Sequence, residues 1–326
     1  MARLVAALLV LSACGPGEDV VTTESPVHIT LDKIDTHRIL GNIVTKYDNP
    51  ISSMSCHDNN LYFSVSDTVA TIYKLEGQDV NPVFSLVNEY QVGYIDVVHS
   101  INVSDEVVTM VNINTSKVVV ANISDGSVNN SDSIVQYRSL GNFSLTDIGT
   151  HNDGYIYRVP GHKRVISFVD RKFNTNNRVM AGSVAKGMSS VSATILDRMS
   201  IEHSNGMTVM AYRYVDSIVL LDGQERYFTL NGVGQPKARE IMMQGQMIVD
   251  VGQLITIYED VDIIDNHIVV LSSSKYGDIL VKIDPVSKTY YEYIIDSGTY
   301  DIKVCNDGIY TASINNKLNN IMYYRF

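Results

Sequence analysis

The sequence predicts an all-β fold, a β-propeller with six blades. A unit of strand, polar turn and second strand recurs six times along the chain. The copies follow one another at intervals of 46, 48, 52, 61 and 41 residues, about the length of chain that a four-stranded blade uses. The absence of tryptophan, together with 20 tyrosines and 7 prolines, also suits a strand-rich chain.

The composition argues against several classes of protein. Of the 326 residues, 45% are hydrophobic and 19% are charged, so the chain can bury a large core and is not disordered. A formal net charge of −11 argues against a nucleic-acid partner, because such binding draws on an excess of Lys and Arg. Three cysteines are too few for a disulfide-rich framework or a zinc ribbon.

The N-terminus is typical of a signal peptide that ends at a lipid-modified cysteine. Arg3 precedes an apolar run from Leu4 to Leu11, which is too short to span a bilayer. The segment LSAC, ending at Cys14, resembles the lipobox of bacterial lipoproteins. We expect a signal peptide at 1–13, lipidation at Cys14 and a flexible tether at 14–25. An ordinary secretory signal, with Cys14 incidental, is the alternative.

An acylated Cys14 would make the membrane a partner of this chain. More than one acyl chain is needed for stable anchoring. We therefore expect a lipid-anchored protein of the cell envelope, at the outer membrane, in which residues 26–326 form one propeller domain.

The six copies can be read directly from the chain. The turns and the strands after them are SCHDNN-LYFSV, NVSDE-VVTMV, THNDG-YIYRV, EHSNG-MTVMA, IIDN-HIVVL and VCNDG-IYTAS. Asn, Asp and Gly supply the backbone conformations of tight turns, and the flanking β-branched and aromatic residues predict hairpins. A strand-like stretch before each hairpin, such as 254–264, predicts the innermost strand of a blade.

The last copy ends at Phe326, after its third strand. Exposed sheet edges favour aggregation, so a fourth strand from elsewhere should pair with it. The stretch from Val27 to Leu31 is predicted to complete this blade and close the ring.

The lipobox, the tether and the six Asn/Asp-Gly hairpin units together resemble TolB-like six-bladed propeller lipoproteins. This resemblance covers nearly all of the chain after Cys14. It implies the fold and a cell-envelope setting, but no chemistry that could be carried over to particular residues.

Candidate site residues come from aligning the innermost strands, since the chain contains no GxGxxG, P-loop, HExxH, GxSxG or EF-hand motif. The residues eight positions before each strand start should meet at one mouth of the central channel; they are Ser53, His99, Asp147, Met199, Asp260 and Asp301. His99, Asp147, Asp260 and Asp301 could bind a ligand there. The alternative is that each Asp caps a loop, with its charge solvated.

A second aligned set lies four residues before the strand starts and contains His57, His151, His203 and Cys305. These positions predict turn residues on the other face rather than a metal site. Cys56 and Cys305 belong to the first and last copies, and we expect two buried thiols. An exported location would permit a disulfide, but adjacent inner strands usually lie too far apart for one.

The loops between second and third strands, at 160–164, 213–216, 272–277 and 315–320, are polar, and the first three carry tyrosine or glycine, as recognition surfaces do. The sequence therefore favours a monomeric, non-enzymatic lipoprotein that binds a protein or glycan and needs no cofactor. The alternative is a propeller hydrolase or lyase that uses a divalent cation at the channel mouth.

Overall fold

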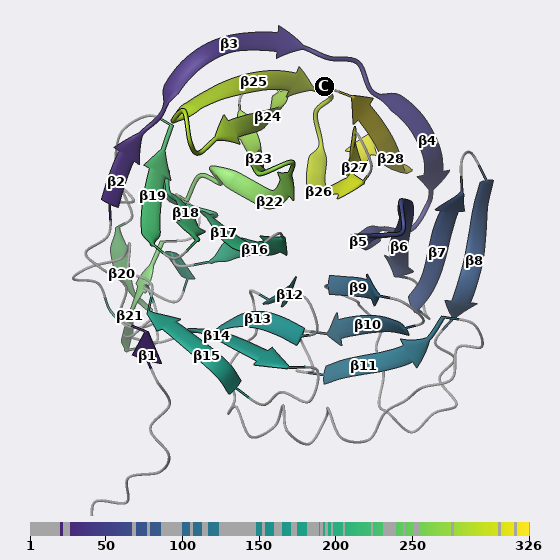
Figure 1. Cartoon of the computed structure of the whole chain (residues 1–326), viewed down its shortest axis with the longest axis horizontal. Coiled ribbons are helices and arrows are strands. Elements are labelled where there is room, and N and C mark those ends of the chain that lie inside the picture. Colours follow the sequence, from purple (N-terminus) through teal and green to yellow (C-terminus); the bar gives the residue numbers. More distant parts are fainter. Residues whose placement is uncertain are drawn as a thin grey trace, which may run out of the picture.

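The computed structural model is a ring of β-sheets, in which paired strands that follow one another in the chain are antiparallel (Figure 1). It describes the following residues: 20–21, 27–66, 70–76, 79–85, 100–104, 107–112, 117–123, 148–151, 154–159, 165–170, 175–180, 189, 192, 195–196, 198–204, 206–222, 224–230, 239–243, 245–250, 254–274, 277–305, 308–315 and 318–325. Within these ranges no helix is long and apolar enough to cross a bilayer.

Five sheets contain four or five strands each and are blades of a β-propeller. The first is built from β5 (Ile51–His57), β6 (Asn60–Ser66), β7 (Ala70–Glu76) and β8 (Asp79–Ser85). The second is built from β12 (Ile148–His151), β13 (Gly154–Val159), β14 (Val165–Asp170) and β15 (Thr175–Met180). The third is built from β16 (Met199–Ser204), β17 (Met207–Tyr212), β18 (Ile218–Leu221) and β19 (Glu225–Thr229). The fourth contains β22 (Tyr258–Ile264), β23 (His267–Ser274), β24 (Gly277–Asp284) and β25 (Thr289–Ile295). The fifth contains β26 (Thr299–Cys305), β27 (Gly308–Asn315) and β28 (Leu318–Arg325).

The predicted propeller fold is confirmed, but the predicted count of six four-stranded blades is not. A further sheet has three strands in the described residues: β9 (Ser100–Ser104), β10 (Val107–Asn112) and β11 (Lys117–Asn122). The stretch that follows it, 124–147, lies outside the described residues. The innermost strands contact one another in the order β5, β9, β12, β16, β22, β26, and β26 also contacts β5.

Two of the tight turns that Asn and Asp predicted lie wholly within the described residues. The turns after β5 and β22 each have two consecutive residues with positive φ, Asp58 and Asn59 in one and Asp265 and Asn266 in the other. Two such residues are the requirement of a type I′ hairpin, whose twist matches that of the strands it joins. The predicted hairpins after β5 and β22 are therefore confirmed.

The N-terminal segment runs round the outside of the ring as a strap, which we define as residues 27–47 (Figure 1). It contains β2 (Val27–Thr30), β3 (Asp32–Arg38) and β4 (Asn42–Tyr47). β2 and β3 pair in parallel with β19 and β25, and β4 pairs antiparallel with β28. Ahead of the strap, β1 (Val20–Val21) lies in the predicted tether and pairs with β15.

The strap corrects the prediction that Val27 to Leu31 completes the last blade. That stretch adds a fifth strand to another blade, and β4 is the fourth strand of the last one. Only residues 48–50 separate β4 from β5. Because the first and last blades are neighbours, the strand nearest to β5 in sequence is the one that can reach β28.

The hydrophobic core lies between the faces of neighbouring blades. One cluster joins residues of β17 and β18 to residues of β22, β23 and β24, and others join β23 to β27, β6 to β27, and β6 to β10. Leu31 from the strap, 3% exposed, belongs to the first of these clusters. The strap is thus packed into the ring as well as hydrogen-bonded to it.

Cys56 and Cys305 form a disulfide, with Cα atoms 5.5 Å apart. The prediction of two buried thiols is therefore wrong. It assumed the usual spacing of adjacent inner strands, but β5 and β26 approach closely at their ends, just before their turns. The bond joins the first blade to the last across a sequence separation of 249 residues.

Candidate binding cavity in the central channel

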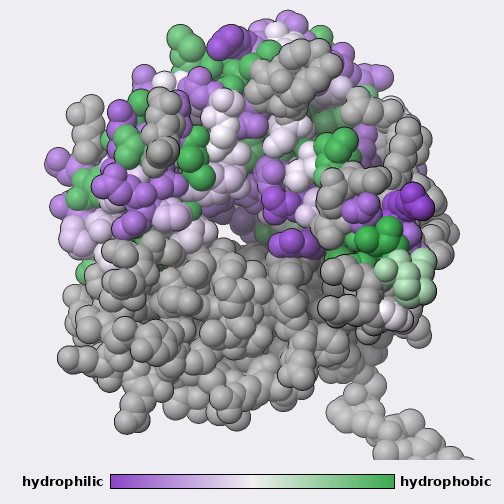
Figure 2. Space-filling view, turned by 180° about the vertical axis from the view of Figure 1, so that it is seen from behind, coloured by the Kyte–Doolittle hydropathy of each residue, from purple (hydrophilic) through white to green (hydrophobic). Residues whose placement is uncertain are grey.

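The innermost strands enclose a cavity of about 610 Å³ along the axis of the ring. Its wall is formed by β5, β9, β16, β22 and β26, with Arg213 and Glu259 at its edge. Figure 2, which views the ring from behind, shows hydrophilic side chains gathered round the hollow in its middle. The cavity is polar because alternate residues of each inner strand point into the channel while the others pack between blades.

Ser53, Asp260 and Asp301 occupy equivalent places in three inner strands. In β5, β22 and β26 the register shifts by one residue just before these three side chains, which marks a β-bulge in each strand. All three residues line the cavity. The alignment of Ser53, Asp260 and Asp301 from sequence is therefore correct.

In two other copies the alignment is wrong by one residue. Ser200 in β16 and Ser100 in β9 stand at the place that Asp260 has in β22, where the sequence suggested Met199 and His99. The error arises at the turn, because Val107 and Met207 pair directly with the last residue before it. His99 and Asp147 lie outside the described residues.

These five side chains form one layer of the cavity wall, which we call the first layer; it contains Ser53, Ser100, Ser200, Asp260 and Asp301. A second layer lies two residues further along each strand and contains Ser55, Asn102, Glu202, Asp262 and Lys303. The sequence analysis missed this second layer. The two-residue period of a strand was the signal that could have found it.

Side chains of both layers join β22 to β26 and β5 to β9. Asp260 and Asp262 accept hydrogen bonds from the backbone N–H groups of Ile302 and Val304, at 3.0 and 2.7 Å. In the same geometry, the hydroxyls of Ser53 and Ser55 accept bonds from backbone N–H groups of β9, both at 3.1 Å. In the described residues, the inner strands of different blades are not joined by backbone hydrogen bonds as the strands of one sheet are. These side chains supply hydrogen bonds between them instead.

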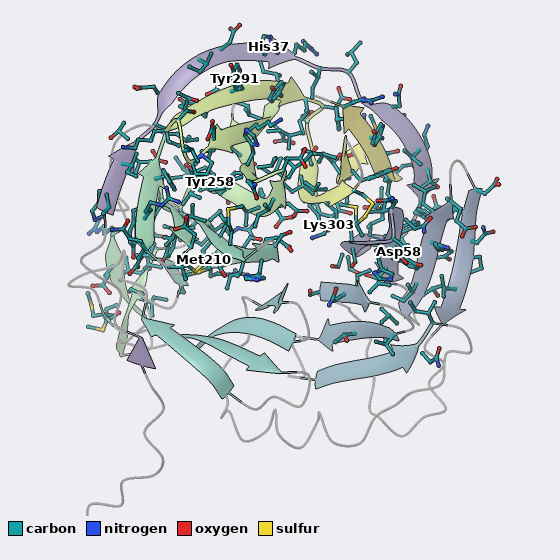
Figure 3. All side chains as sticks on the ribbon, in the orientation of Figure 1. His37, Asp58, Met210, Tyr258, Tyr291 and Lys303 are labelled. Carbon is teal, nitrogen blue, oxygen red and sulfur yellow. A yellow bond between two sulfur atoms is a disulfide. The ribbon has the colours of Figure 1, made fainter. Side chains whose placement is uncertain are left out.

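Lys303 holds two carboxylates of the second layer. Its Nζ lies 3.0 Å from Glu202 and 3.3 Å from Asp262, and Figure 3 shows Lys303 on the inner side of β26. Burial raises the pKa of Glu202 from 4.5 to about 7, although Lys303 opposes the change. Burial also raises the pKa of Asp262, whereas the pKa of Lys303, which burial alone would lower, rises because of Asp262 and Glu202.

In the first layer, Asp301 and Asp260 are hydrogen-bonded to each other. Burial, and then the nearby charge of Asp260, raise the pKa of Asp301 well above its ordinary value of 3.8. Asp260 also accepts hydrogen bonds from Ser200 Oγ and from the backbone N–H of Val261, the latter at 2.9 Å.

In the second aligned set, His203 and Cys305 line the cavity and His57 does not. His57 is 3.4 Å from Asp58 at a turn, and the Nδ1 atom of His203 is 2.8 Å from the hydroxyl of Thr208. The side chain of His151 is outside the described residues. Among the residues that the structure describes, no group of three or more His, Cys, Asp and Glu side chains is arranged to hold a metal ion.

The predicted recognition loops differ from one another. Residues 160–164 are not described, and Asp216 in the loop at 213–216 is buried and accepts a bond of 2.5 Å from Tyr258 Oη. In the loop at 315–320, Asn319 and Asn320 are buried. At the cavity edge, Arg213 lies 2.6 Å from Glu259, whose pKa is raised by burial.

No protein-family model matches the chain, and no curated protein matches it. Solved propeller structures do match. The chain is a β-propeller. U3-55K is 7% identical over 88% of this chain and 98% of its own, with a TM-score of 0.55, and the WD40 repeats of RRP9 are 7% identical over 87% and 97%, also at 0.55.

A candidate exported protein of Bacteroides fragilis is 10% identical over 92% of this β-propeller and 99% of its own chain, with a TM-score of 0.53. Identities this low show the fold alone. The resemblance to TolB-like lipoproteins is therefore not confirmed as a family relationship.

Proposed function

We propose that this β-propeller is a binding module of the cell envelope, anchored to the membrane through an acylated Cys14. The polar cavity of about 610 Å³ carries the binding part of the proposal. Hydroxyl, amide, carboxylate and ammonium groups alternate in its two layers, and this mixture of donors and acceptors suits a glycan or a polar segment of a protein. Asp260 and Asp301 belong to this proposed site, and the proposal extends to Asp147, which lies outside the described residues. Ser100 takes the place that the sequence gave to His99.

The Cys56–Cys305 disulfide supports the location. Disulfides persist in oxidising compartments such as the bacterial periplasm and the cell surface, and are rare in the cytosol. Three further features of the proposal are a monomeric state, the outer membrane as the site of anchoring and β9–β11 as a sixth blade. The place of β9 in the sequence of contacts between β5 and β12 supports the sixth blade.

Two variants test the binding site. Asn102 lies in the second layer, and Asn102→Trp would fill the cavity, whereas Leu40→Trp places the same side chain on the strap at a position that is already 82% exposed. Both proteins are used to capture glycans and proteins from envelope extracts. The proposal expects Asn102→Trp to lose material that the wild type and Leu40→Trp retain. Equal capture by all three would contradict it.

The anchor has a separate test. Cys14→Ala should abolish lipid labelling and release the protein from membranes, because the acyl chains are attached to that thiol. A labelled, membrane-bound Cys14→Ala protein would refute the assignment.

The alternative of a metal-dependent hydrolase or lyase is distinguished by thermal stability with Ca²⁺, Mn²⁺ or Zn²⁺. Binding to the folded state raises the Tm. The binding-module proposal expects no change in Tm with any of these ions or with a chelator, and a rise of several degrees would favour the enzyme.

A further inference from the structure

A two-stranded hairpin that belongs to no blade presents apolar side chains to solvent. It consists of β20 (Glu240–Met243) and β21 (Gln246–Val249), and it lies within the longest interval between repeats. Met242 and Met247 face each other across the two strands and are 67% and 40% exposed. Ile241, on the opposite face, is 36% exposed.

The base of this hairpin is fixed to the ring. The Glu240 carboxylate accepts hydrogen bonds from the backbone N–H of Ser189, at 3.0 Å, and from the hydroxyl of Ser192. The hydroxyl of Ser189 donates to the carbonyl of Met247 at 2.7 Å. Val249 is fully buried and belongs to the same cluster as Leu196. These contacts hold the hairpin to the ring at both its base and its Met247 backbone, while the side chains of Met242 and Met247 remain exposed.

The hairpin and the N-terminus of the described chain lie on the same side of the ring (Figure 1). Ser189 and Ser192 belong to the connection between β15 and β16, and β1 pairs with β15. Only five residues lie between Cys14 and Val20, so the two can be at most about 20 Å apart. A membrane that holds Cys14 must lie within that distance of β1.

We propose that the β20–β21 hairpin inserts its methionine tip into the membrane interface and sets the orientation of the ring on the lipid surface. The inference rests on the proposed anchor at Cys14. Flexible apolar side chains at an interface bury surface among lipid headgroups and acyl chains. Because the anchor keeps the hairpin at a high local concentration of lipid, a small apolar tip suffices to insert into the membrane.

The chain has no tryptophan, so one introduced tryptophan reports alone. Met242→Trp and Met247→Trp are the reporters, and Leu40→Trp is the control, because it lies between β3 and β4 on the other side of the ring. Each protein is bound to vesicles of phosphatidylethanolamine and phosphatidylglycerol that contain a brominated phosphatidylcholine. Brominated acyl chains quench tryptophan only on contact.

The proposal expects a blue shift and a loss of emission for both reporter variants and neither change for Leu40→Trp. Emission of both reporters that is as unquenched as that of the control would overturn it. A partner protein or a second copy would then be the occupant of the tip.

The anchor is tested independently, by the mass of the peptide that contains Cys14. If Cys14 is not acylated, the anchor proposal fails, and a maleimide phospholipid is coupled to Cys14 for the same fluorescence measurement. Cys14 is then the one free thiol, because Cys56 and Cys305 are joined. Whether or not Cys14 is acylated, the fluorescence measurement therefore supports or overturns the hairpin proposal.

Discussion

At the scale of single residues, Asp262 shows how the channel holds the ring together. Its side chain is almost fully buried, accepts a bond of 2.7 Å from the backbone N–H of Val304, and lies 3.3 Å from the ammonium of Lys303. One carboxylate thus joins β22 to β26 by a backbone bond and by an ion pair. Removing it would leave a buried cation with Glu202 as its one ion-pair partner among the residues that the structure describes.

Asp262→Ala should lower the free energy of unfolding by about 3 kcal/mol, because it breaks a buried ion pair and a hydrogen bond between blades. Asp48→Ala removes an exposed carboxylate and is the matched control. Denaturant titration followed by circular dichroism measures both variants. If the two variants had the same stability, the role of the second layer would be disproved.

Glu202 makes stability depend on pH. Its pKa is raised from 4.5 to about 7 in the folded protein, so its contribution is fully present below pH 4.5 and is lost as the pH rises through 7. Burial, Asp262 and Asp260 act in this direction, and Lys303 acts against it. The pKa of Asp301 is also raised, so Asp301 too contributes stability that is lost as the pH rises.

The Tm should therefore fall between about pH 5 and pH 8, and Glu202→Gln should flatten this fall because it removes a titrating group worth up to about 3 kcal/mol. Glu76→Gln, at an exposed position on the first blade, is the control and should keep the wild-type profile. Thermal melts at a series of pH values give the answer. If the Tm of Glu202→Gln fell with rising pH as steeply as that of the wild type, Glu202 would be ruled out as the source of the pH dependence.

At the scale of elements, turns and registers determine which side chains meet in the channel. The hairpins after β5 and β22 could be predicted because Asn and Asp tolerate positive φ. The bulges in β5, β22 and β26 could not, because the extra residue leaves no mark in an alternating pattern. The sequence placed Asp260 and Asp301 correctly but chose Met199 where Ser200 lines the first layer, because Met207 pairs directly with the last residue before its turn.

Gly298 joins β25 to β26, and the register of β26 depends on it. Its φ is 90°, and a Cβ atom there would lie 2.4 Å from the carbonyl oxygen of Ile314. Gly298→Ala should cost about 2–4 kcal/mol, because it adds a backbone clash to the cost of the left-handed conformation. Gly206→Ala, where φ is 76° and no atom lies within 4 Å, should cost only about 1 kcal/mol.

Chemical denaturation of these two glycine variants separates the clash from the conformational cost. A Gly298→Ala protein no less stable than Gly206→Ala would show that the turn can relax, and that it does not fix the position of Asp301.

At the scale of the whole molecule, the strap and the disulfide are the features that sequence reasoning did not reach. Repeat spacing predicted a ring, but the strap pairs with three successive blades through contacts between distant parts of the chain, which leave no periodic signal. Likewise, Cys56 and Cys305 lie in copies that the ring makes neighbours, yet only the local approach of β5 and β26 decides whether they bond.

The Cys56–Cys305 disulfide carries the central claim, since it joins the first blade to the last and supports a location in an oxidising compartment. The direct test is peptide mass mapping of protein from the envelope fraction, alkylated while denatured and without reduction. The account predicts a cross-linked pair of peptides containing Cys56 and Cys305, with neither cysteine alkylated. Alkylation of both cysteines without reduction would contradict the account.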